Sequence, residues 1–143
     1  MNKIVNHILS FLQLIILAIV FLVQYFSTRK MGMMRHVVYT NQKWEANYPI
    51  ATYELGAIAV VAIIALIVGI KLFVKLKSEN KDAIWMKIFA LQMAVSIIYI
   101  GFSLIYSTEQ IRSYYYINIG LLLTVFLQTM KSCLYITISE KNY

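Results

Sequence analysis

The chain has 143 residues, of which 61% are hydrophobic and only 13% are charged; the formal net charge is +7 and the mean hydropathy is +0.71. Soluble domains carry about twice that share of charged residues, so the composition excludes an ordinary soluble protein and indicates a membrane protein. The basic residues flank apolar segments, which favours contact with anionic lipid headgroups and argues against nucleic acid as a partner. The single cysteine, Cys133, excludes an internal disulfide.

The chain contains apolar, charge-free stretches that predict membrane-spanning helices. A helix needs about 20 apolar residues to cross about 30 Å of hydrocarbon, and each stretch approaches or exceeds that length. Taken in chain order, the predicted helices cover about residues 5–28, 50–76, 83–108 and 113–138. The fold class we expect is therefore all-α: an integral membrane protein in which residues 1–143 form a single domain, a four-transmembrane-helix bundle.

Between the first two spans, residues 29–48 predict an amphipathic helix that lies at the membrane surface. On a helical wheel the polar arc contains Arg29, Gly32, Arg35, His36, Tyr39 and Lys43, and the apolar arc contains Met31, Met33, Met34, Val37, Val38 and Trp44. Such a helix lies flat in the interface, with its apolar side among the lipid headgroups. Asn47 and Pro49 then start the next helix.

The same segment brings thioether and imidazole groups close together in the sequence. Met31, Met33, Met34 and His36 carry the kinds of ligand that copper(I) prefers. A copper transporter or chaperone would need further soft ligands along a path, and the other methionines are scattered. We therefore expect no metal and no other cofactor.

Polar residues inside the spans indicate the faces by which the helices pack, because lipid is as apolar as leucine. In the 83–108 span, spacings of four and three place Gln92, Ser96, Tyr99, Ser103 and Tyr106 on one face. The 113–138 span carries Thr124, Gln128, Lys131 and Tyr135 at similar spacing, and the 5–28 span carries Asn6, Ser10, Gln13 and Gln24. We expect these faces to meet, with Gln13, Gln92, Ser96, Tyr99 and Gln128 forming a polar interhelical face.

The 50–76 span differs from the other three in having a run of small residues. These residues are Gly56, Ala59, Ala62, Ala65 and Gly69. Small side chains let two backbones approach closely, so this span is expected to be the most tightly packed.

The lysines in the short loops predict the orientation. They concentrate in the N-terminal, middle and C-terminal segments, which places both termini of this multi-pass protein in the cytoplasm, beneath the cell membrane. All three arginines, Arg29, Arg35 and Arg112, fall on the opposite, outer side together with Glu45, Glu54 and Glu109. We expect at least one Arg–Glu pair there.

No catalytic residue pattern occurs in the sequence, and no ionisable group lies near mid-membrane. The leading hypothesis is therefore a non-enzymatic accessory, regulatory or immunity-type subunit of a bacterial-type plasma membrane, which contacts a membrane-protein partner or a second copy of itself. One alternative is a membrane enzyme or lipophilic-ligand binder with an outer pocket formed by Arg35, Glu54, Arg112 and Tyr116. Another is a small oligomeric transporter with a polar path lined by glutamine, tyrosine and serine.

Overall fold

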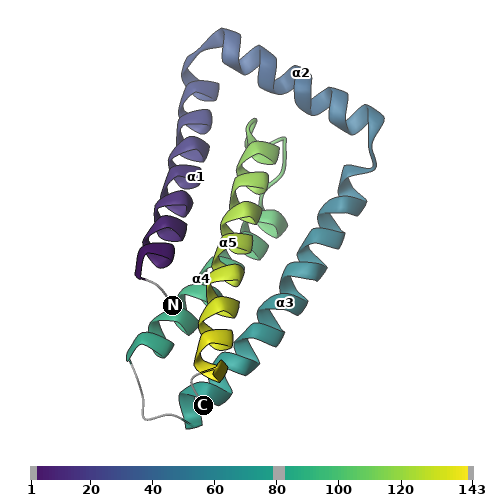
Figure 1. Cartoon of the computed structure of the whole chain (residues 1–143). Coiled ribbons are helices and arrows are strands. Elements are labelled where there is room, and N and C mark those ends of the chain that lie inside the picture. The colour runs from purple at the N-terminus through teal and green to yellow at the C-terminus, as the bar shows by residue number, and fades with distance from the viewer. Residues whose placement is uncertain (1–2, 79–82, 142–143) are drawn as a thin grey trace.

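The structure is a computed structural model, and it describes residues 3–78 and 83–141. Within these ranges the chain forms five helices and no strand (Figure 1). They are α1 (Lys3–Arg29), α2 (Met31–Asn47), α3 (Ile50–Ser78), α4 (Ala83–Ile105) and α5 (Tyr114–Lys141). The all-α prediction is confirmed.

Four of the helices are long and apolar enough to cross a membrane. The qualifying stretches are Ile4–Arg29, Ile50–Val74, Trp85–Ile105 and Tyr114–Ile138. They correspond to the four spans expected from the sequence and support a multi-pass membrane protein.

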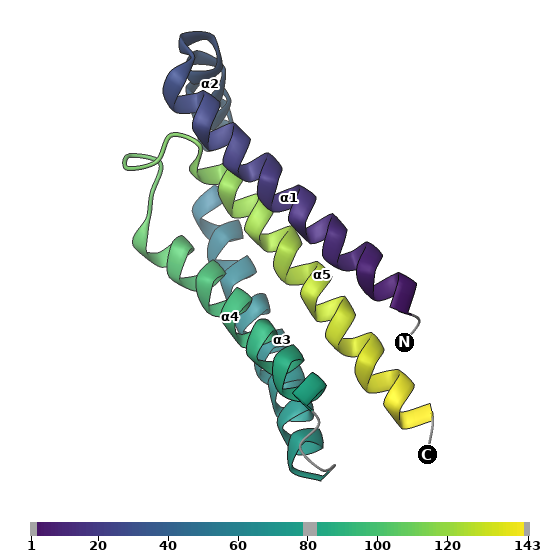
Figure 2. The ribbon, with the colours of Figure 1, turned by 90° about the vertical axis from the view of Figure 1, so that its left-hand side faces the viewer.

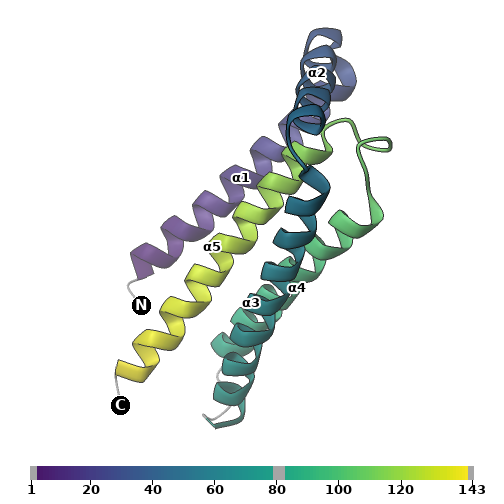
Figure 3. The same cartoon turned by 90° about the vertical axis from the view of Figure 1, so that its right-hand side faces the viewer.

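The four long helices form a bundle, and α2 lies across one end of it (Figure 1). Both termini, the end of α3 and the start of α4 lie toward the other end. We refer to these as the α2 end and the terminal end. Helix α5 packs against α1, α3 and α4. Figures 2 and 3 show α1 beside α5, with α3 and α4 paired on the other side of α5.

Two extended residues set α2 at an angle to its neighbours. Lys30, between α1 and α2, has φ −113° and ψ 118°, and Tyr48, after α2, has φ −135° and ψ 144°. Tyr48 precedes Pro49, whose ring disfavours a helical conformation in the preceding residue. Pro49 then starts α3, because its carbonyl accepts hydrogen bonds from the backbone N–H groups of Thr52 and Tyr53 at 3.1 and 3.3 Å. The predicted role of Pro49 is confirmed, whereas Asn47 ends α2 instead of starting α3.

Helix α4 ends at Ile105, three residues before the predicted boundary at 108. The chain turns here because the Ser107 carbonyl accepts hydrogen bonds from the N–H groups of Gln110 and Ile111, at 3.2 and 3.0 Å. This turn leads into α5, which begins at Tyr114.

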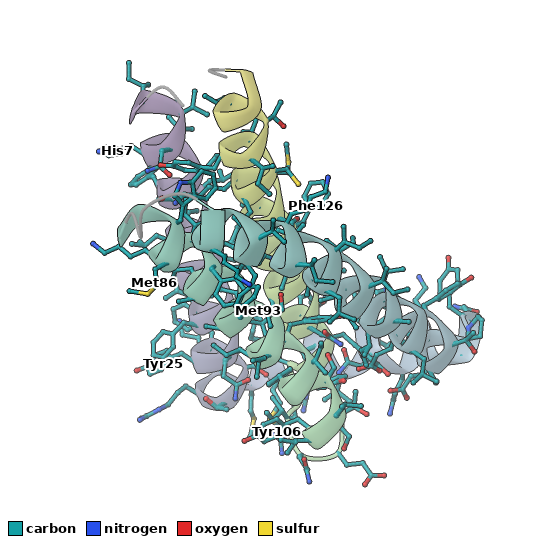
Figure 4. All side chains as sticks on the ribbon, turned by 90° about the horizontal axis from the view of Figure 1, so that it is seen from below. His7, Tyr25, Met86, Met93, Tyr106 and Phe126 are labelled. Atoms are coloured by element: carbon teal, nitrogen blue, oxygen red, sulfur yellow. The ribbon has the colours of Figure 1, made fainter. Side chains whose placement is uncertain are left out.

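Among the described residues, buried apolar side chains form two small clusters. Val68, Leu72, Trp85, Ile88 and Ile136 form one, and Val61, Tyr99 and Val125 form the other. Many other large apolar side chains are exposed, as expected where lipid replaces a protein neighbour. Seen from the terminal end, His7, Met86 and Phe126 lie at the edge of the bundle, whereas Met93 lies nearer its centre (Figure 4).

Among the described glycines, Gly120 on α5 has the closest neighbour, which belongs to α1. A Cβ atom on Gly120 would collide with Cγ2 of Val20, whereas one on Gly69 would meet the Met93 sulfur at an ordinary 3.4 Å. A Cβ on Gly56 would meet nothing within 4 Å. These contacts concern glycines alone, so the prediction that the 50–76 span is the most tightly packed stays a prediction. At Gly120 of α5, the β-branched Val20 of α1 fills the space above the backbone.

Candidate functional site

Polar side chains on α1 and α5 join these two helices along their length. The Gln13 side chain donates to Oε1 of Gln128 at 3.1 Å, and the Lys131 ammonium donates to the Ser10 hydroxyl at 2.8 Å. Nearer the α2 end, the Ser113 hydroxyl donates to the Gln24 side chain. These contacts confirm that the polar faces of the first and last spans meet.

The polar stripe of α4 lies against α5. Gln92, Ser96, Tyr99 and Ser103 are each 9% exposed or less. The Ser132 hydroxyl donates to Oε1 of Gln92 at 3.1 Å, and the Ser103 hydroxyl donates to Oδ1 of Asn118 at 3.0 Å. Tyr106, the last member of the predicted stripe, lies beyond the end of α4 and is 43% exposed.

The interhelical glutamines therefore connect helices. Hydrogen bonds of this kind contribute about 0.6 to 2 kcal/mol each inside a membrane and specify which faces meet. In the described part of the chain, the Nε2 atoms of Gln92 and Gln128 are buried without a partner, so each amide uses its oxygen between helices.

Helix α2 is fastened to the start of α5. The Asn41 side chain donates to the Arg112 carbonyl at 2.7 Å, and the Tyr115 hydroxyl donates to Glu45 at 2.8 Å. The Trp44 ring lies 6.3 Å from the Tyr115 ring and 5.8 Å from that of Tyr116, centroid to centroid.

The side of α2 that faces the bundle is the one expected to face lipid headgroups. Val37 is 1% exposed and Asn41 is 6% exposed, and Met33, Met34 and Trp44 on the same side are half-buried. Val37 and Asn41 are therefore buried against the protein instead of among headgroups, whereas Met31 and Val38 of the predicted apolar arc are exposed, and their contact with lipid stays a prediction.

A pocket of about 180 Å³ opens at the α2 end, where α2, α3, α4 and α5 come together. Its walls include Trp44, Tyr53, Glu54, Tyr99, Tyr115 and Asn118. Glu54 lies in the second turn of α3, and Oε1 of its carboxylate accepts hydrogen bonds from the Tyr114 hydroxyl and, at 3.0 Å, from the Asn118 amide. We call this the Glu54 pocket.

Of the four residues predicted to form an outer pocket, only Glu54 lines it. Arg35 lines a separate hollow on α2 together with Met34 and Tyr39. Arg112 is exposed, its guanidinium contacts the Met34 sulfur, and Tyr116 packs on Trp44 instead.

The expected Arg–Glu pair is also missing. Within residues 3–78 and 83–141, no ion pair joins any of the three arginines to Glu45, Glu54 or Glu109, so this expectation was wrong. Arg35 lies on the exposed side of α2, and neutral donors from α5 reach Glu54 instead.

Sequence reasoning missed Tyr114 and Asn118 as the partners of Glu54. Tyr114, Asn118 and Leu122 are spaced by four residues and share a face of α5. An amide inside an apolar run is a signal for a buried polar contact. That signal, combined with the spacing, could have found this site.

The sulfur and imidazole groups of α2 differ in their surroundings. Met31 is 75% exposed, His36 is exposed, Met33 is half-buried and Met34 contacts Arg112. Among the described residues, no group of three or more His, Cys, Asp and Glu side chains could hold a metal ion.

The Glu54 pocket combines one carboxylate with aromatic and apolar walls, which suits binding of a ligand through charge and ring contacts. Comparison with known proteins adds no further assignment. No family model, curated protein or solved structure matches this chain.

Proposed function

We propose that the protein is a non-enzymatic accessory, regulatory or immunity-type subunit of a bacterial-type plasma membrane. The distribution of lysines supports cytoplasmic termini, which makes the α2 end the outer face. In this proposal α2 is the recognition element, and its partner is another membrane protein or a second copy of the chain.

The observation that carries this proposal is the fastening of α2 across the bundle. Asn41 and Trp44 hold its inner side, so its outer side is displayed in a fixed position. That side exposes Arg35, Tyr39 and Lys43, and tyrosine and arginine are enriched where proteins bind one another. A surface ordered before binding loses less conformational entropy when a partner arrives.

Site-specific photo-crosslinking in native membranes tests the proposal. A photoreactive phenylalanine analogue replaces Tyr39, which is 65% exposed on α2, or Phe73, which is 60% exposed on the apolar side of α3. The two positions are matched in aromatic character and exposure. We expect a discrete crosslinked product from position 39 and only lipid adducts from position 73.

The Tyr39 product should disappear when Arg35 and Lys43 are both changed to Gln, because these charges share the exposed side of α2. A protein crosslinked at position 73 and none at position 39 would contradict the proposal.

A second candidate function is binding of a lipophilic ligand at the outer interface. The specific observation in its favour is the Glu54 carboxylate in a hollow with aromatic walls. Transport receives no comparable support, since Gln13, Gln92 and Gln128 each take part in a bond between helices.

A further inference from the structure

Only one oxygen of the Glu54 carboxylate accepts hydrogen bonds from the described residues. Both of its hydrogen-bond donors, from Tyr114 and Asn118, reach Oε1. Among the described residues nothing donates to Oε2, and this oxygen is not one of the buried atoms without a partner, so it remains accessible. One face of the carboxylate is thus held by α5, and the other is open.

The protein supplies no positive charge to this open oxygen. No Lys or Arg lines the Glu54 pocket, and no described cation lies within ion-pair distance of the carboxylate. Moving an ionised carboxylate into an apolar environment is costly unless a cation pairs with it. A positively charged ligand would remove that cost.

The walls of the pocket suit a particular kind of cation. Trp44, Tyr53, Tyr99 and Tyr115 surround the space beside Glu54. Aromatic faces attract cations through their electron-rich rings, and groups of such rings recognise quaternary ammonium ions. The lining therefore favours a weakly hydrated ammonium group over a small, strongly hydrated metal cation.

The size and position of the pocket indicate the rest of the ligand. Its volume of about 180 Å³ is small compared with the roughly 300 to 1,000 Å³ of pockets that enclose drug-sized ligands. A second hollow of about 300 Å³ shares Leu122 with it and lies between α3 and α5, with Val60, Ile64 and Phe126 among its walls. This hollow is almost entirely apolar, which suits a hydrocarbon chain.

We infer that the Glu54 pocket binds an amphiphilic monocation, with its ammonium head against Glu54 and its hydrocarbon chain in the hollow between α3 and α5. This inference rests on the second candidate function above and names its ligand class. A zwitterionic phospholipid fits less well, because no Lys or Arg in either lining would meet its phosphate.

Titration calorimetry on the purified full-length chain in a neutral detergent tests the inference, with octyltrimethylammonium below its micellar concentration as the probe. We expect saturable binding with one site per chain. Glu54→Gln keeps an oxygen for Tyr114 and Asn118 but removes the charge, so it should weaken binding roughly 10- to 100-fold. Glu109→Gln, at an exposed carboxylate of the same end, should leave the affinity unchanged.

Two further probes carry the same octyl chain but no net positive charge, so they show whether the affinity comes from the cationic head group. Octyl glucoside and octylphosphocholine should bind far more weakly than the cation, and Glu54→Gln should not affect them. Equal binding of octylphosphocholine would overturn the inference and indicate a phospholipid site. Equal weakening by Glu109→Gln would also overturn it, because it would show a non-specific charge effect.

If Glu54→Gln does not fold, Ala57→Leu provides an independent test, because Ala57 lines the pocket and a larger side chain there takes up space in it without changing the charge. Ala57→Leu should abolish binding of the cation, and unchanged binding would overturn the inference.

A separate experiment distinguishes failure of this inference from failure of the recognition role proposed for α2. Crosslinking at Tyr39 in a Glu54→Gln background should persist whether or not the pocket binds a cation.

Discussion

Replacement of Gly120 by leucine is expected to separate α1 from α5 and to lower the free energy of unfolding by about 1 to 3 kcal/mol. A Cβ at this position collides with Cγ2 of Val20, which is β-branched and so has little freedom to move aside. The hydrogen bonds donated by Gln13 to Gln128 and by Lys131 to Ser10 depend on the same approach of the two helices and would lengthen. Unfolding in increasing sodium dodecyl sulfate, followed by circular dichroism, measures the change.

Gly56→Leu is the matched control for this prediction, because a Cβ on Gly56 meets nothing within 4 Å. It should unfold close to wild type. Gly120→Ala alone should also lower the free energy of unfolding. Combining it with Val20→Ala should restore much of that free energy, because the second change removes the colliding methyl group. Equal stability of the Gly120 and Gly56 leucine variants would show that α1 and α5 do not pack as described.

Asn118→Leu should produce the second large effect, a loss of about 1 to 3 kcal/mol. Asn118 accepts from Ser103 on α4 and donates to Glu54 on α3, so one amide on α5 ties three helices together. Leucine keeps a similar volume but leaves the Glu54 carboxylate with Tyr114 as its sole described partner. The same unfolding titration measures the loss.

A double-mutant cycle separates the contribution of each bond. Asn118→Leu combined with Glu54→Leu, and separately with Ser103→Ala, should give coupling energies of roughly 0.6 to 2 kcal/mol. Asn47→Leu, at the exposed end of α2, is the control and should couple to neither. Additive losses in both cycles would mean that Asn118 does not connect these helices.

The sequence predicted the interior of the bundle well because its signal is local. Spacings of three and four place Gln92, Ser96 and Tyr99 on one face of a single helix, and a polar face inside a membrane has few alternatives to meeting another polar face. The same reasoning identified Gln13 and Gln128, which the structure joins.

The position of α2 over the bundle could not be predicted from the sequence. Its amphipathic pattern indicates that Val37 and Met34 must leave solvent, and the same pattern fits burial in lipid or against the bundle. The outcome depends on the angles at Lys30 and Tyr48, which position α2 over α5. Local periodicity does not specify such angles.

Sequence reasoning selected Glu54 but not the residues that donate hydrogen bonds to its carboxylate. Opposite charges on one side of the membrane suggested Arg35 and Arg112, because ion pairs are the obvious means of satisfying a carboxylate. The structure instead supplies Tyr114 and Asn118, neutral donors one turn apart on α5. Four helices contribute to the pocket, so its composition follows from tertiary packing and not from any one segment.

If the four long apolar helices cross the membrane, as their length and composition indicate, the α2 end and the end with both termini face opposite sides. Labelling of single cysteines with a membrane-impermeant maleimide, in a Cys133→Ser background, tests this claim directly. Tyr39→Cys on α2 and Lys77→Cys near the end of α3 are both exposed positions. In intact cells Tyr39→Cys should be labelled and Lys77→Cys should react only after the membrane is opened; labelling of both positions from outside would contradict the claim.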